Sequence, residues 1–170
     1  MLQYANEAGQ QFGYRYMKDA DDVPYTCFYT STVSVPRHIL GAEPFDPTFR
    51  TYGWEDIDVG YRLAKRGVRL IYNRKARARH RHPMELSDFY RRQVKVGNAV
   101  GALYALHPEL MQDQPLMPPP SRSHIGLTLG RRVVPLLVPL INWLDCRMVR
   151  LPERVYHAVL SIGYWIGRGR

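Results

Sequence analysis

The sequence predicts an α/β domain followed by amphipathic, apolar helices. Two segments rich in β-branched and aromatic residues, 25–35 and 68–73, predict strands. Two segments with helical periodicity, 56–66 and 86–108, predict helices. A proline-rich segment then precedes two apolar stretches. We therefore expect a domain over residues 1–111, a stiff linker over 112–123 and a basic helical tail over 124–170.

The composition predicts a folded protein with one modest core. The chain has 170 residues, of which 45% are hydrophobic and 12% aromatic. Its net charge of +9 favours anionic partners such as phosphates, nucleic acid or a lipid surface. Cys27 and Cys146 are far apart among apolar neighbours, which predicts reduced, buried thiols in a reducing compartment. The first sixteen residues lack a basic start followed by an apolar run, so we expect no signal peptide.

The first half of the chain predicts a strand, a loop and a helix in that order. Residues 25–35 are expected to form the strand, and Pro36 opens a short helix. Glycine and proline mark residues 41–53 as a loop. In the helix over 56–66, Ile57, Tyr61 and Ala64 fall on one stripe, and Gly67 is placed as a C-cap. The strand over 68–73 follows.

The second predicted helix, over 86–108, has recognisable ends. Ser87 is the expected N-cap and Pro108 the expected stop. Gly97 and Gly101 are four residues apart, which predicts a face where another backbone comes close.

Three carboxylates crowd the start of the first helix. Glu55, Asp56 and Asp58 directly follow an aromatic-glycine-aromatic turn. One acid would suffice as a cap, and the alternative interpretation is that the others are solvated. The adjacent Trp54 could hold a sugar ring, with a carboxylate at its edge accepting a hydroxyl proton. This arrangement suits a general base.

Two further patterns have both a functional and a structural interpretation. His80 and His82 lie on one face of an extended segment, about 7 Å apart, where they either face water and anions or share a metal. A metal site would need oxygen ligands, and Asp19 and Asp21 are read as a polar loop. Arginines of the second helix could face a diphosphate or form a solvated basic face; these are Arg91 and Arg92, next to Lys95.

The tail holds most of the positive charge. Residues 121–170 contain eight arginines against two acids, a net +6. The apolar stretches 133–144 and 155–166 are each about 12 residues, short of the roughly 20 needed to span a bilayer. Their arginine flanks and tryptophans favour segments that lie in the interface of an anionic membrane. The alternative is a pair of core helices packed on the domain.

Residues 25–110 resemble the C-terminal half of glycosyltransferases of GT-A fold, of the family 2-like and galactosyltransferase-like kind. Four pieces match in order: "FYTSTVSVPRHIL", "FDPTFRTYGWEDIDVGYRLAKRGVRLIYN", "ARARHRHP" and "FYRRQVKVGNAVGALYALHPEL". The resemblance implies that Asp56 is the catalytic base, that Trp54 helps to form the acceptor site and that Glu55 binds the acceptor. Tyr52 and Gly53 of the same turn are expected to line this site. It also implies a divalent metal, Mn²⁺ or Mg²⁺, with His80 as a ligand. His82 is a less favoured ligand, from its spacing to His80 alone.

The resemblance further implies an inverting transfer from a nucleotide-sugar to a glycan or lipid-linked acceptor. The family's nucleotide-binding half with its Asp-x-Asp ligands has no counterpart in residues 1–20. We therefore expect an acceptor-side half, with a donor-binding half elsewhere, located peripherally on the cytoplasmic face of a membrane. The alternatives are a degenerate partner subunit or a non-catalytic basic binding module. Nucleic acid is not expected, because the basic residues concentrate in an apolar tail.

Overall fold

The computed structural model describes residues 14, 17–78, 85–113, 124–147 and 151–169. This part of the chain is mostly helical and holds one sheet of two short strands. Strand β1 (Asp22–Val23) pairs antiparallel with β2 (Leu70–Ile71). The α/β expectation is therefore met only in part, and β2 is shorter than the predicted strand over 68–73.

The strand predicted over 25–35 is wrong. The segment instead forms two 3₁₀ turns, η2 (Tyr25–Cys27) and η3 (Thr30–Thr32). Its backbone is bonded locally, since Cys27 N–H donates to the Pro24 carbonyl at 2.9 Å and Thr32 N–H to the Tyr29 carbonyl at 3.0 Å. Strand propensity reflects packing against a neighbouring strand, and within the described residues this segment pairs with none. The short helix after Pro36 is confirmed as α2 (Arg37–Leu40).

The first long helix is confirmed within one residue as α3 (Glu55–Lys65). Gly67 adopts φ +78° after it. Gly67 N–H donates to the Ala64 carbonyl at 2.9 Å and Val68 N–H to the Leu63 carbonyl at 3.1 Å, the paired bonds of a Schellman cap. The expected apolar stripe is shifted, because Ala64 is exposed and the neighbouring Leu63 is buried.

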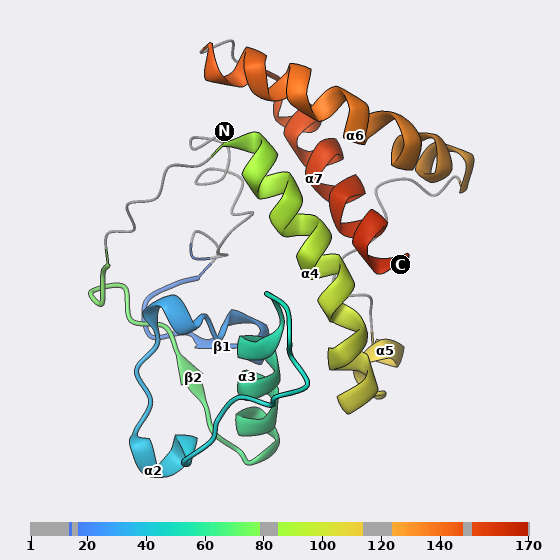
Figure 1. Cartoon of the computed structure of the whole chain (residues 1–170). Helices are drawn as coiled ribbons and strands as arrows, with labels where there is room; N and C mark the ends of the chain where they lie inside the picture. The colour runs from blue at the N-terminus through green and yellow to red at the C-terminus, as the bar shows by residue number, and fades with distance from the viewer. Residues whose placement is uncertain (1–13, 15–16, 79–84, 114–123, 148–150, 170) are drawn as a thin grey trace.

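The other helices are α4 (Leu86–Leu106), α5 (Leu110–Asp113), α6 (His124–Cys146) and α7 (Glu153–Arg168). Helix α4 runs between the α3 region and α7, and α6 packs across α4 and α7 at the end farther from α3 (Figure 1). The helix predicted over 86–108 is thus confirmed. It ends before Pro108, because a residue preceding proline is disfavoured in helical conformation.

Glycines bring α4 and α7 into backbone contact. A Cβ added at Gly97 would lie 2.0 Å from the Tyr164 carbonyl oxygen, and one at Gly167 would lie 2.0 Å from that of Val94. The close approach expected at Gly97 is confirmed. At Gly101 it is wrong, because a Cβ there would meet nothing within 4 Å.

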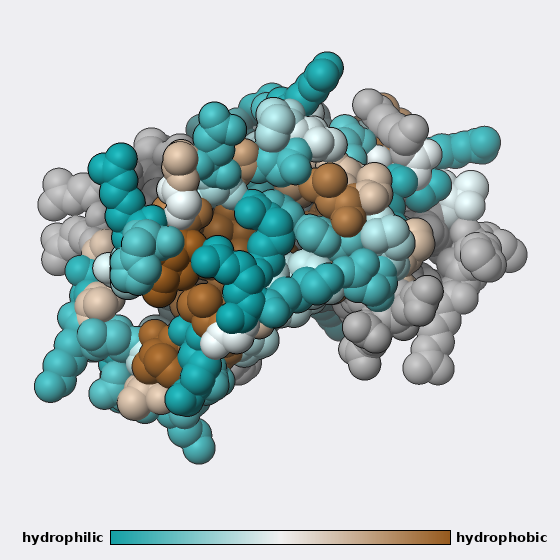
Figure 2. Space-filling view, turned by 90° about the horizontal axis from the view of Figure 1, so that it is seen from below, coloured by the Kyte–Doolittle hydropathy of each residue, from teal (hydrophilic) through white to brown (hydrophobic). Residues whose placement is uncertain are grey.

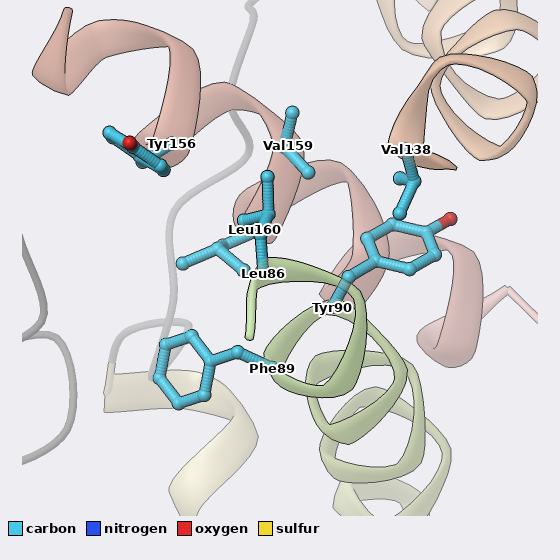
Figure 3. Packing of buried hydrophobic residues seen from close by; sticks show 7 residues of the cluster. All are labelled: Leu86, Phe89, Tyr90, Val138, Tyr156, Val159 and Leu160. Carbon is cyan, nitrogen blue, oxygen red and sulfur yellow. The ribbon is translucent and has the colours of Figure 1, made fainter. Parts of the chain in front are cut away.

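Helices α4, α6 and α7 share one hydrophobic cluster. Val138 of α6 lies beside the Tyr90 ring of α4, with Val159 and Leu160 of α7 next to Leu86 (Figure 3). Helix α7 is therefore a core helix, as in the second interpretation of the tail.

Helix α6 also caps α4. The N-cap of α4 is Glu85, which makes no capping bond through its side chain, and Ser87 lies inside the helix. The Asn142 side chain accepts the Ser87 N–H at 3.1 Å instead. The predicted Ser87 cap is wrong because its role is filled by a residue far away in sequence.

Seen from the end that carries α2 and the lower part of α3, hydrophobic surface shows between hydrophilic side chains (Figure 2). A cavity of about 470 Å³ lies between α3, the two strands and the segment 24–39, and is lined largely by apolar residues, among them Phe28, Val35 and Ile39.

Candidate functional site

The turn before α3 is held in a left-handed backbone. Gly53 has φ +118° and Trp54 has φ 75°. A Cβ at Gly53 would meet the Val96 side chain of α4 at 3.1 Å, so the turn packs directly on that helix. The Gly53 N–H donates to the Glu55 carboxylate at 2.8 Å. Glu55 therefore stabilises the turn that begins α3.

Trp54 joins this turn to the helices behind it. Its indole N–H donates to the Val96 carbonyl at 2.7 Å, and its ring meets the Tyr164 ring edge-on with centroids 6.4 Å apart. Trp54 is partly buried. The side chain predicted to bind an acceptor thus also holds α3 against α4 and α7.

Asp56, the predicted base, is half-buried at the first turn of α3. It accepts the Ile57 backbone N–H at 2.9 Å and a backbone hydrogen bond from Thr30. Burial, followed by the nearby Glu55 carboxylate, raises the pKa of Asp56 from 3.8 to about 6, although the backbone hydrogen bonds act in the opposite direction.

Asp58 has a different environment from Asp56. It is 1% exposed and is paired with Arg62 at 2.7 Å. Its other oxygen lies 2.7 Å from His107 Nε2, just beyond the end of α4. This network ties α3 to α4. The i,i+4 spacing of Asp58 and Arg62 could have indicated their pairing from the sequence, whereas nothing local points to His107.

The three acids therefore have three different partners. Glu55 binds a turn N–H, and Asp58 binds two basic side chains. Among the described residues, no ion pair involves Asp56. A partly exposed carboxyl with a raised pKa is suited to take up a proton near neutral pH.

The structure brings Tyr52 and Arg92 together. Tyr52 is 47% exposed, and the Arg92 guanidinium lies 4.5 Å from its ring centroid and donates to its hydroxyl. Burial lowers the pKa of Arg92, but an arginine stays cationic at neutral pH. Arg91 is instead paired with Asp88 on an exposed surface. Of the two arginines predicted to bind a diphosphate, only Arg92 joins the residues around the turn.

The predicted metal ligands His80 and His82 lie outside the described residues. In the part of the chain that is described, no group of three or more His, Cys, Asp or Glu side chains could hold a metal ion. Asp19 accepts the Arg74 N–H and Asp21 the Lys18 N–H, each at 2.8 Å, which is the local bonding of a polar loop. The metal site therefore stays a prediction.

A cavity of about 590 Å³ lies beside β2 and η3. Its lining includes Arg69, Arg74 and Arg77 together with Tyr72 and Thr32. Asp56 lines neither this cavity nor the apolar one next to α2. The basic cavity could accept an anionic group, but it is separate from the turn that carries Asp56.

The two cysteines are unpaired. Cys27 is half-buried, and burial raises the pKa of its thiol. Cys146 is exposed, so the expectation that both thiols are buried is wrong for this residue.

Comparisons with known proteins found no relative of this chain. No family model, curated protein or solved structure matches it. In the described residues, no helix is both long and apolar enough to cross a membrane.

Proposed function

We propose that the chain is the acceptor-side half of an inverting glycosyltransferase of GT-A fold. It would act on a nucleotide-sugar and a glycan or lipid-linked acceptor. The observation that carries the proposal is Asp56: it is partly exposed beside Trp54, has a pKa of about 6 and belongs to none of the described ion pairs. A general base works best when its pKa lies near the operating pH.

In the proposed reaction, Asp56 takes the proton of an acceptor hydroxyl. The acceptor oxygen forms a bond to the anomeric carbon as the bond to the diphosphate breaks, and the nucleoside diphosphate leaves on the opposite side. Tyr52, Gly53, Trp54 and Glu55 would shape the acceptor side, and Arg92 is the better placed of the two arginines for the diphosphate. A divalent metal, with His80 as the proposed ligand and His82 the less favoured one, would neutralise charge on the leaving group.

One observation favours a second candidate, a degenerate partner subunit or a non-catalytic binding module. The Trp54 N–H and the Glu55 carboxylate are both bound within the fold. Such a protein would keep the acceptor-binding turn without using Asp56 as a base.

We further propose that the protein attaches peripherally to the cytoplasmic face of a membrane. The support is the charge of the tail, where residues 121–170 carry eight arginines against two acids. Anionic headgroups attract basic residues next to apolar segments. This location would fit a lipid-linked acceptor.

A transfer assay with Asp56→Asn tests the proposed reaction. The full chain, with the donor-binding half supplied in trans, is incubated with nucleotide-sugars labelled in the sugar, Mn²⁺, and pools of oligosaccharides and membrane lipids as acceptors. Asn has the shape of Asp but cannot take the proton, so we expect transfer to fall by roughly 10²–10⁴-fold. In the parent chain, the rate should also fall as the pH drops below the Asp56 pKa of about 6.

The control is Asp46→Asn, a partly exposed loop carboxylate that accepts the Thr48 N–H at 2.8 Å. It should transfer at the parental rate. Equal rates for the parent and Asp56→Asn would remove Asp56 as the base. No transfer by the parent, with glycan binding that Asp56→Asn leaves unchanged in saturation-transfer NMR, would favour the degenerate subunit.

A further inference from the structure

Helix α6 has an outer face of large apolar side chains that are exposed to solvent. These residues are Leu129, Val133, Leu136, Leu137, Leu140 and Trp143. Most of them follow steps of three and four residues, so they form one stripe along the helix. Leu136 is 79% exposed and Leu140 is 55% exposed. We call this stripe the outer face.

The opposite side of α6 is fixed to the protein at several points. Arg131 donates to the Trp165 carbonyl at 2.8 Å, and Asn142 accepts the Ser87 N–H at 3.1 Å. Tyr156 donates to Asp145, and Val138 is buried in the shared cluster. Because this side is held by α4 and α7, the outer face is directed away from the rest of the molecule.

The charges around the outer face are positive. Arg132 is exposed on the same helix, and the Arg147 guanidinium lies 4.3 Å from the Trp143 ring centroid just beyond the helix end. The only acid between residues 124 and 147 is Asp145, whose carboxylate is bonded to Tyr156. An apolar stripe with arginines and a tryptophan at its margin is typical of a helix that lies in a membrane interface.

We propose that α6 alone is the membrane-contacting element and that it lies flat on an anionic lipid surface with its outer face inserted among the acyl chains. Helix α7 is excluded from this role because its large apolar side chains are buried or partly buried. None of the exposed large apolar residues of the described chain lies on α7, whereas α6 carries six of them. A second copy of the chain on the same face would bring Arg132 and Arg147 of both copies together, whereas anionic headgroups complement them. The inference rests on the proposed peripheral location and is independent of sugar transfer.

Vesicle sedimentation of the full chain tests this assignment. The vesicles contain equal parts of phosphatidylcholine and phosphatidylglycerol, or phosphatidylcholine alone. We expect the parent to sediment with the anionic vesicles and Leu136→Asp/Leu140→Asp to lose binding by about tenfold or more for each leucine. The matched control is Phe45→Asp/Met111→Asp, which removes two exposed apolar side chains elsewhere and makes the same change in charge. This control should bind much more like the parent.

A second measurement reports how deeply α6 enters the bilayer. Its variant leaves the charge of the chain unchanged. Brominated lipids quench tryptophans that enter the acyl region. We expect quenching in the parent and loss of most of it in Trp143→Phe, because Trp54 and Trp165 pack within the protein.

The outcomes separate the inference from the location on which it rests. If the parent binds neither kind of vesicle, the peripheral location itself fails. If Leu136→Asp/Leu140→Asp binds as the parent does, or quenching survives Trp143→Phe, the location stands and the assignment to α6 is wrong. A parent that dimerises through Leu136 and Leu140 and ignores vesicles would also overturn the proposal.

Discussion

Asp56 and Asp58 lie on the same helix two residues apart, yet their surroundings differ. Asp58 is fully buried and compensated by Arg62 and His107. A buried carboxylate needs such partners, because burial of an unpaired charge is costly. Asp56 is only partly buried, and the nearest charge acting on it is the like-charged Glu55. Asp58 therefore ties α3 to the end of α4, whereas burial and then the charge of Glu55 raise the pKa of Asp56.

The raised pKa of Asp56 predicts an effect on stability. A carboxyl whose pKa rises from 3.8 to about 6 on folding binds protons more tightly in the folded state. Its contribution to stability therefore falls as the pH rises between these two values. We expect Asp56→Asn to stabilise the protein by about 1–2 kcal/mol near neutral pH, after discounting for partial exposure to solvent, and by almost nothing near pH ~4.

Urea unfolding of the parent and Asp56→Asn at the two pH values checks this expectation. Asp46→Asn is the control, because the pKa of that carboxyl is lowered rather than raised, chiefly by hydrogen bonds from Thr48. A loss of stability in Asp56→Asn near neutral pH would contradict the unfavourable burial of the charge.

The position of Asp56 could be predicted from the sequence, but the partners of the acids could not. Three acids beside an aromatic-glycine-aromatic turn are a local signal for a helix start, and the structure has them in the first turn of α3. The link from Asp58 to His107 spans 49 residues and depends on how α3 docks on α4. The role of Trp54 in contacting Val96 depends on the same docking. Local patterns identify which residues gather at a helix start, whereas their bonding is set by tertiary structure.

At the scale of elements, glycines determine how closely α4 and α7 approach. Gly97 and Gly167 each face a carbonyl of the other helix with no room for a side chain. Gly101 lies on the same helix as Gly97 with open space around it. The chain thus contains both a test position and its matched control within one helix.

We expect Gly97→Ala and Gly167→Ala to destabilise the protein by about 1–3 kcal/mol or more, because a Cβ at either site would separate the two helices. Gly101→Ala should instead stabilise it by roughly 0.5–1 kcal/mol, since alanine has the higher helix propensity. Urea midpoints and slopes for the three variants measure the difference. A Gly97→Ala protein as stable as the Gly101→Ala protein would mean that α4 and α7 leave room for a side chain at Gly97.

The elements themselves were predictable where their signals are local. The acids, basic residues and Gly67 fixed the ends of α3, and Pro108 fixed the end of α4. The strand predicted over 25–35 is wrong because β-branched and aromatic residues are also suited to half-buried turns. Gly97 and Gly101 are equivalent in the sequence, and only the position of α7 distinguishes them.

At the scale of the whole molecule, the expected tail consists of two helices with different roles. Helix α7 completes the core by packing Tyr156, Val159, Leu160 and Tyr164 against the rest of the protein. Helix α6 covers part of this core with one side and presents its outer face with the other. The apolar content of the two stretches is similar in the sequence, so composition alone could not separate them.

This division predicts that residues 1–113 do not fold stably by themselves. Each of the four large α7 side chains contributes about 1.5–3 kcal/mol by burial, so their loss approaches the whole stability of a typical domain, about 5–15 kcal/mol. The shortened chain would also expose the Gly97 face of α4 and lose the Asn142 cap on Ser87. We expect it to bind a hydrophobic dye and to lose cooperative unfolding, whereas Leu136→Asp/Leu140→Asp keeps the parental transition, because only exposed side chains change. A sharp urea transition at the parental midpoint for residues 1–113 would show instead that α7 packs on a domain that is already complete.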